Sequence, residues 1–146
     1  MEEMTIGQVA RKCCVNVETI RFYERKGLIE RPAQPVTGYR KYPPETAVRV
    51  RFIRNAKNLG FSLREIRDLL SLATERRRRC AETRAMAEGK IAEIDRKVKA
   101  LLGMREELSI LVDACRRGTR DSGCPILVAL GERAVGSDTL KVNRKE

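Results

Sequence analysis

The chain has 146 residues and a mass of 16.6 kDa, enough for one small domain with an extension but not for two independent enzyme domains. Lysine and arginine number 31 against 20 aspartates and glutamates, a net charge of +11, which favours a polyanionic partner over an acidic protein or a metabolite. Histidine is absent, which removes the commonest general base and the commonest nitrogen ligand for metals.

The positive charge is concentrated in the first half of the chain. Residues 1–79 carry 18 basic and 9 acidic side chains, whereas residues 80–146 carry 13 and 11. No apolar run approaches the roughly 18 residues that span a bilayer, and Met1-Glu2-Glu3-Met4 lacks the basic and apolar regions of an export signal. We therefore expect no membrane partner, a cytoplasmic location and reduced cysteines.

The N-terminal residues predict two short helices across a tight turn. Thr5-Ile6-Gly7-Gln8 forms a capping box at the start of a helix that runs to about Lys12. The second helix runs from Val17 to Lys26 and ends at Gly27. Together they predict a helix-turn-helix.

Residues 28–42 change pattern, because prolines and a glycine interrupt them and basic and aromatic side chains crowd their ends. This pattern predicts a two-stranded basic hairpin, a candidate wing. Pro43-Pro44 then begins a third helix that Gly60 ends, and the capping box Ser62-Leu63-Arg64-Glu65 begins a fourth.

The longest periodic stretch is residues 81–114, which contain no proline and predict one long helix. An apolar heptad pattern with one charged position indicates a dimeric coiled coil. Residues 116–123 are predicted as a loop, residues 125–130 as a short apolar helix and residues 131–146 as a polar, frayed tail. The heptad a and d positions are Ala87, Ile91, Ile94, Val98, Leu101, Arg105, Leu108 and Val112.

The first half has the physical properties of a duplex DNA-binding module. A short second helix fits the major groove, and basic side chains neutralise phosphates and release counterions. Charge runs often form only a solvated face, but the helix pair, the wing and the charge asymmetry agree in favouring DNA. The predicted DNA contacts are Thr19, Arg21, Tyr23, Arg25, Lys26, Tyr39, Arg40, Lys41 and Tyr42.

Four blocks of residues, in order, resemble the MerR family of transcription regulators. The resemblance covers residues 5–72 and implies a winged helix-turn-helix, a long antiparallel dimerisation helix and a C-terminal effector site. It departs at Cys14, where members often carry glycine, which predicts either a strained turn or a slightly altered angle between the helices. Cys13 and Cys14 are otherwise expected to be small, partly buried residues. The blocks are Thr5-Ile6-Gly7, Val17-Glu18-Thr19-Ile20-Arg21-Phe22-Tyr23-Glu24-Arg25-Lys26-Gly27-Leu28-Ile29, Gly38-Tyr39-Arg40-Lys41-Tyr42 and Leu59-Gly60-Phe61-Ser62-Leu63-Arg64-Glu65-Ile66.

The remaining thiols, Cys80, Cys115 and Cys124, have a spacing that suggests a shared metal site. Cys80 and Cys115 are 35 residues, or five heptads, apart on one predicted helix, which separates them by about 52 Å. An antiparallel partner brings Cys80 of one subunit beside Cys115 of the other, and the loop 116–123 folds Cys124 back as a third thiolate. By symmetry, this arrangement predicts two equivalent sites per dimer, each with three thiolates.

Three soft thiolates without imidazole favour a thiophilic ion over hard ions and over structural zinc, which usually takes four ligands. The four arginines 76–79 beside Cys80 are expected to favour its thiolate. The alternative is that Cys115 is a core residue and the other two thiols are incidental. The thiols, with Cys124-Pro125-Ile126 leading into a short helix, resemble the mercury(II)-responsive members, which implies one Hg(II) per site; lead- and cadmium-responsive members also use three cysteines.

These observations predict a mostly α-helical protein: a winged helix-turn-helix over residues 1–75, a dimerisation helix over 76–115, a metal-binding loop and short helix over 116–130 and a flexible tail over 131–146. Family likeness implies a homodimer on double-stranded promoter DNA that activates or represses a mercury-resistance promoter, with RNA polymerase as partner, by distorting the DNA when Hg(II) binds. A thiol metal buffer or redox protein is the alternative. The sequence contains neither a glycine-rich phosphate-binding loop nor paired carboxylates in a plausible cleft, so it does not favour an enzymatic function.

Overall fold

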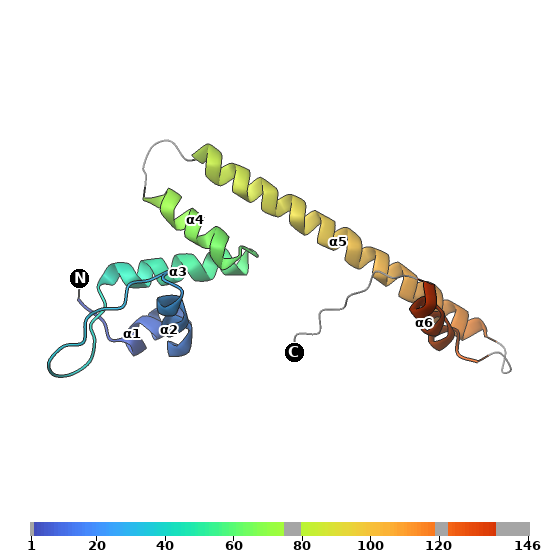
Figure 1. The fold of residues 1–146 in the computed structure, drawn as a ribbon, viewed down its shortest axis with the longest axis horizontal. Helices are drawn as coiled ribbons and strands as arrows, with labels where there is room; N and C mark the ends of the chain where they lie inside the picture. Colours follow the sequence, from blue (N-terminus) through green and yellow to red (C-terminus); the bar gives the residue numbers. More distant parts are fainter. Residues whose placement is uncertain (1, 75–79, 119–122, 137–146) are drawn as a thin grey trace. The chain divides into compact units, whose positions relative to one another are not determined.

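The computed structural model describes residues 2–74, 80–118 and 123–136, and within these ranges it contains helices and no strand (Figure 1). The chain divides into two compact units, Met1–Lys90 and Ile91–Glu146. The helices are α1 (Ile6–Cys13), α2 (Val17–Arg25), α3 (Pro44–Asn58), α4 (Leu63–Ala73), α5 (Cys80–Arg117) and α6 (Pro125–Gly136).

Side-chain caps define the starts of α1, α2 and α4, as the sequence predicted, and α3 begins at the predicted prolines without a side-chain cap. Thr5 and Gln8 close a capping box at α1, Asn16 caps α2, and Ser62 and Glu65 close a second box at α4. Each cap satisfies backbone N–H groups that have no partner inside the helix. The predicted helix-turn-helix is therefore confirmed.

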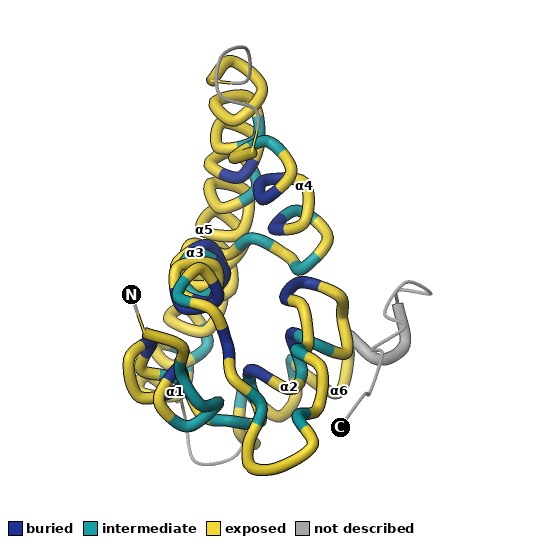
Figure 2. The backbone as a smooth tube through the Cα atoms, turned by 90° about the vertical axis from the view of Figure 1, so that its left-hand side faces the viewer, coloured by how far each residue is buried: buried dark blue, intermediate teal, exposed yellow. Residues whose placement is uncertain are grey.

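The core of the first unit lies among α1, α2, α3 and α4, with α3 packing against both α1 and α4. Figure 2 shows the buried positions in dark blue mainly along these helices and the loop that follows α2. Because each short helix buries one apolar face here, packing rather than intrinsic helix propensity stabilises the unit. The fully buried side chains with the largest volume are Ile20, Leu28, Ile53, Ile66, Val9 and Val50.

The turn between α1 and α2 carries the predicted strain at Cys14. Its φ of 53° places it in the left-handed region, and it is the one non-glycine residue with a positive φ in the part of the chain that the structure describes. Cys14 is exposed, so the expectation that it would be partly buried is wrong. Cys13 is buried, and its thiol donates a hydrogen bond to the Ala47 carbonyl at 3.3 Å.

The segment between α2 and α3 differs from the two-stranded hairpin that the sequence predicted. Residues 28–42 form an irregular loop, and their single β-bridge joins Tyr42 to Met4. The Pro32 carbonyl accepts a hydrogen bond from Arg40 Nε at 3.0 Å, so a side chain takes the place of a cross-strand backbone donor. Proline lacks the N–H that a strand ladder needs, which is the physical reason for the difference.

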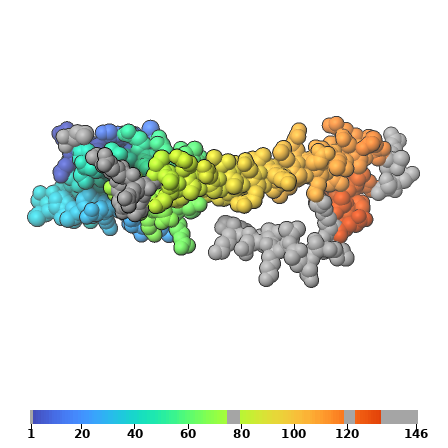
Figure 3. All heavy atoms as spheres, turned by 90° about the horizontal axis from the view of Figure 1, so that it is seen from above, coloured from blue at the N-terminus to red at the C-terminus, as the bar shows by residue number. Residues whose placement is uncertain are grey.

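The long helix α5 spans 38 residues, slightly more than the predicted 81–114, and its apolar face is uncovered in the single chain. Ile91, Leu101 and Leu108 are each more than half exposed. Figure 3 shows α5 in yellow and orange with side chains projecting along the face in view. A helix with such an exposed stripe needs a partner surface to be stable in water.

The helix α6 extends to Gly136, so the prediction that it ends at Leu130 is wrong. Gly131, the first residue of the predicted tail, lies inside the helix, where a glycine weakens a helix without stopping it. The rest of the predicted tail, residues 137–146, lies outside the described residues. None of the described helices combines the length and apolarity needed to cross a bilayer.

Replacing Cys14 by glycine is expected to raise the free energy of unfolding by about 1 kcal/mol, because glycine adopts the left-handed conformation without the Cβ clash. Urea unfolding at fixed protein concentration measures the change. The control Cys14→Ala keeps a Cβ and should show no gain. Equal stabilisation by both substitutions would contradict the strained turn.

Candidate functional site

The exposed face of α2 carries basic side chains, and other side chains of the same helix contact them. The Asn16 side chain accepts hydrogen bonds from the backbone N–H and the hydroxyl of Thr19, both at 2.7 Å. Arg21 is exposed and pairs with Glu18 at 2.7 Å. At the end of the helix, the charged groups of Arg25 and Lys26 lie 6.0 and 5.7 Å from the Phe22 ring centroid, within cation–π range.

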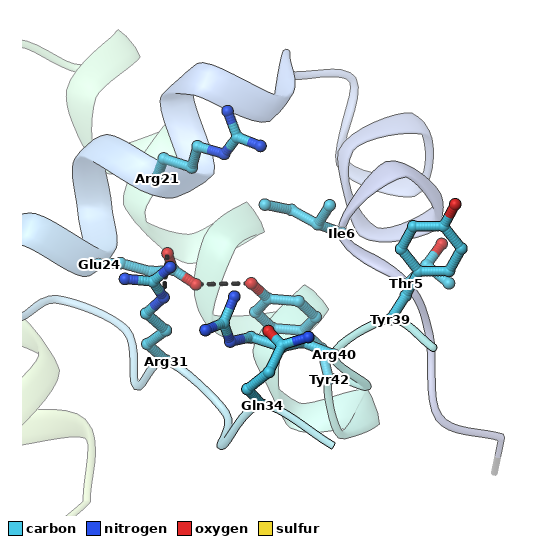
Figure 4. A pocket seen from close by; sticks show the side chains of 9 residues that line it. All are labelled: Thr5, Ile6, Arg21, Glu24, Arg31, Gln34, Tyr39, Arg40 and Tyr42. Atoms are coloured by element: carbon cyan, nitrogen blue, oxygen red, sulfur yellow. Dashed lines mark hydrogen bonds and ion pairs between the residues drawn. The ribbon is translucent and has the colours of Figure 1, made fainter. Parts of the chain in front are cut away.

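The loop after α2 adds a second basic group of residues. Tyr39 is 81% exposed, Lys41 is exposed, and Arg40 is half-buried because it bonds the Pro32 carbonyl. A cavity of about 250 Å³ lies between this loop, α2 and the start of α1 (Figure 4). Three arginines line it, Arg21, Arg31 and Arg40, so the surface around it is strongly positive.

One acidic side chain, Glu24, lies among these arginines and ties the loop to α2. Its side chain is 8% exposed, it accepts a hydrogen bond from the Tyr42 hydroxyl at 2.6 Å, and Arg31 Nε lies 4.0 Å from its other oxygen (Figure 4). Burial, then the Glu24 hydrogen bond and charge, raise the pKa of Tyr42 to about 12. Sequence reasoning missed Glu24, although an acidic residue within a basic helix was a detectable signal.

Two of the predicted DNA contacts are placed in the core instead. Tyr23 and Tyr42 are each 2% exposed, and the Tyr42 hydroxyl is already engaged by Glu24. The prediction that Tyr23 and Tyr42 donate to phosphates is therefore not supported by this structure. Aromatic rings next to basic residues were interpreted as contacts because sequence spacing does not show which face of the module they occupy.

Two of the three predicted metal-ligating cysteines lie on α5 and the third directly before α6, and all three are exposed. Cys80 is the first residue of α5, Cys115 lies in its last turn, and Cys124 directly precedes α6. Within the described residues no group of three or more potential ligand side chains converges on one point. The structure brings Cys115 and Cys124 together, since a hydrogen bond joins their side chains.

The Cys124 thiol has an environment that favours its thiolate form. Backbone N–H groups of Leu127 and Ile126, at the start of α6, lower the pKa of Cys124; desolvation opposes them in part, and a hydrogen bond with Cys115 adds a smaller lowering. The cause is the one expected at a helix N-terminus, where free N–H groups stabilise negative charge. The arginines predicted to act on Cys80, residues 76–79, lie outside the described residues.

Comparison with known proteins shows which family this chain resembles in sequence. The chain matches the family model for MerR HTH family regulatory proteins over residues 4–73 and the model described as MerR, DNA binding, over residues 47–111. It is 42% identical over 130 residues to the mercuric resistance operon regulatory protein of Shigella flexneri, with 89% of each chain covered.

Two solved structures are also similar. The transcription regulator PbrR691 from Ralstonia metallidurans, in complex with lead(II), is 34% identical with a TM-score of 0.75, over 87% of this chain and 98% of that one. The dual-function regulator MerR from Bacillus megaterium, in complex with mercury(II), is 35% identical with a TM-score of 0.67, over 88% and 99%.

A helix-turn-helix with a basic helix and a basic loop beside it defines a DNA-binding transcription regulator, not an enzyme. The chain belongs to the MerR family. The predicted mostly helical fold with an N-terminal helix-turn-helix and a long helix, the family resemblance and the DNA-binding role are thereby confirmed.

The two tyrosines of the loop are expected to behave oppositely. Tyr42→Phe removes the bond to the buried Glu24 carboxylate and should lower the free energy of unfolding by about 1–2 kcal/mol. Tyr39→Phe, at an exposed ring, should leave stability unchanged. Urea denaturation of both variants gives the comparison, and equal stability of Tyr42→Phe and the unmodified chain would contradict the Glu24 interaction.

Proposed function

We propose that this chain is a homodimeric regulator of a mercury-resistance promoter that responds to Hg(II). One ion binds to Cys80 of one subunit together with Cys115 and Cys124 of its neighbour, which gives two sites per dimer. The observation that carries the proposal is the Cys115–Cys124 thiol pair at one end of α5, with Cys80 at the other end of that helix.

The length of α5 supports a site shared between subunits. Cys80 and Cys115 are separated by 35 residues of continuous helix, which corresponds to about 52 Å along the axis. A second chain running antiparallel places its Cys80 beside the first chain's pair. The exposed heptad residues, such as Ile91, Leu101 and Leu108, supply the apolar face for that pairing.

The donor set fits a soft, thiophilic cation. Cys124 is already biased toward thiolate by backbone N–H groups, and thiolates prefer soft ions to Mg²⁺ or Ca²⁺. Two of the similar proteins support this choice of ion. One is a mercuric resistance operon regulatory protein that matches this chain in sequence over 89% of its length, and the other is a MerR structure in complex with mercury(II) that is similar in fold. When bound, the ion would join the two subunits through metal–thiolate bonds. The chain supplies the thiolates and their spacing along α5.

The DNA-binding unit converts metal binding into a change in transcription. Promoter DNA contacts α2, its C-terminal cap and the loop that follows, and the dimer distorts that DNA so that RNA polymerase can use the promoter. The contact residues are Thr19, Arg21 and Arg25 on α2, Lys26 at its cap, and Tyr39, Arg40 and Lys41 in the loop. An ion shifts the equilibrium between two dimer shapes only by its difference in affinity for them. A site that spans the subunit junction supplies that difference.

Lead(II) is the second candidate ion, because the regulator from Ralstonia metallidurans in complex with lead(II) has the same fold. Both ions accept thiolate ligands, so the donor set alone does not separate them. Competition between Hg(II), Pb(II) and Cd(II) for the purified dimer, followed by thiolate-to-metal charge-transfer absorbance, ranks the three ions.

Mixed dimers test the sharing of the site. A heterodimer of Cys80→Ser and Cys115→Ser subunits keeps one intact set of three thiols, so it should bind one Hg(II) with the absorbance of the unmodified site, while neither mutant homodimer does. The matched control pairs Cys115→Ser with Cys124→Ser, which leaves no intact set because both thiols come from the same subunit. Equal three-thiolate absorbance in the two heterodimers would overturn the arrangement.

Replacing Arg25 by alanine tests the proposed DNA surface. Loss of one phosphate contact should weaken binding to the operator that the unmodified chain protects in footprinting, and it should reduce the slope of log K against log salt by about 1 per subunit. Arg96→Ala, on the outside of α5, is the control and should leave the slope unchanged. An unchanged slope for Arg25→Ala removes that residue from the contact surface.

A further inference from the structure

Lys90 is the one residue of α5 that the structure describes as buried. Its side chain is 8% exposed, and its ammonium lies 3.1 Å from Glu65 Oε2 and 5.6 Å from the Phe61 ring centroid. Its aliphatic stem packs against Gly60, whose φ of 90° turns the chain between α3 and α4. Met86, one turn earlier on the same face of α5, also packs against the core of the first unit.

The partner of Lys90 already has a structural role at the start of α4. Glu65 Oε2 accepts the Ser62 backbone N–H at 2.7 Å in the capping box. That hydrogen bond, followed by the contact with Lys90, lowers the pKa of Glu65, so the carboxylate stays charged through the neutral range. A single carboxylate thus joins the N-terminus of α4 to the buried ammonium of α5.

The next basic residue on α4 makes a contact on another side of that helix. Arg67 donates a hydrogen bond to the Lys26 carbonyl, at the residue that caps the end of α2. Residues 65 and 67 differ by about 200° around a helix, so the two contacts leave α4 on nearly opposite faces. The helix that bears the proposed DNA contacts and the helix that bears Cys80 are therefore both fastened to α4.

We propose that Lys90, Glu65 and Arg67 are positioning residues that make α4 the coupling element between α5 and α2. This inference rests on the proposed function, since it concerns how a metal-induced shift of α5 reaches the DNA surface. Separating α5 from α4 would break the Lys90–Glu65 ion pair and expose to water the apolar contacts that Met86 makes with the core of the first unit, and both changes are unfavourable. The first turns of α4 consequently follow α5, and Arg67 transmits the movement to the end of α2.

The experiment uses Lys90→Met in the full-length dimer, because methionine keeps an apolar stem of similar length and removes the charge. Transcription from the operator-containing promoter is measured with and without Hg(II), alongside metal stoichiometry and operator affinity. We expect the induction ratio to fall by roughly fivefold, in the range that single coupling contacts produce, with metal binding and apo operator affinity essentially unchanged. Lys99→Met, at an exposed lysine of α5, is the matched control and should keep the full ratio.

A double-mutant cycle isolates the ion pair. Glu65→Gln preserves an acceptor for the capping box but removes the charge, so it should reduce induction as Lys90→Met does, and the double variant should lose little more. Arg67→Met should reduce induction with both other contacts intact, whereas Arg64→Met, at an exposed position of α4, should not. Thermal unfolding of each variant identifies any that fails to fold.

Two outcomes separate this inference from the proposed function. Full induction by Lys90→Met and Glu65→Gln, in dimers that bind Hg(II) normally, would overturn the coupling role while leaving the mercury sensor intact. Absence of Hg(II) binding or induction in the unmodified dimer would overturn the proposed function itself. Additive losses in the double variant would show that the two residues act separately and would also contradict the inference.

Discussion

The length of a continuous α5 is the constraint on which the proposed metal site depends. A helix of 38 residues holds its first and last turns apart, so Cys80 and the Cys115–Cys124 pair belong to opposite ends. Because the backbone of α5 forms its hydrogen bonds within the helix, the helix does not fold back to bring Cys80 to the thiol pair of its own chain. In the proposed dimer, an antiparallel second chain resolves this separation and at the same time covers Ile91, Leu101 and Leu108, which are exposed in the single chain. The same pairing thus explains the ligand set and the uncovered apolar face.

The DNA-binding unit shows a second principle, in which buried polar groups position exposed basic ones. Glu24 fastens the loop to α2 through Tyr42 and Arg31, and the solvent-facing Tyr39 and Lys41 belong to that loop. Lys90 and Glu65 play a comparable part between α5 and α4. One side chain of each contact, Glu24 or Lys90, is largely removed from water, so losing its partner is costly while it stays buried, and the attached segments tend to move together.

Local signals in the sequence predicted the helices well, because capping residues and apolar periodicity act over a few residues: the boxes at Thr5 and Ser62 formed as expected. The hairpin of residues 28–42 failed because Tyr42 pairs with Met4, far away in sequence, and Pro32 withholds a donor. The buried positions of Tyr23 and Tyr42, the role of Glu24 and the Lys90 contact likewise depend on tertiary packing, which spacing does not encode. For the thiols, the sequence located Cys115 and Cys124, while the structure added the N–H groups that favour thiolate.

Cross-linking of isotopically mixed dimers tests the antiparallel shared site most directly. Dimers assembled from equal amounts of ¹⁴N and ¹⁵N chains are treated with a short bis-maleimide, and peptides joining Cys80 to Cys115 or Cys124 are identified by mass spectrometry. The account predicts that such peptides include light–heavy pairs at the statistical frequency of mixed dimers. Cross-links confined to light–light and heavy–heavy pairs, in samples where mixed dimers are present, would show that the thiols meet within one chain and would contradict it.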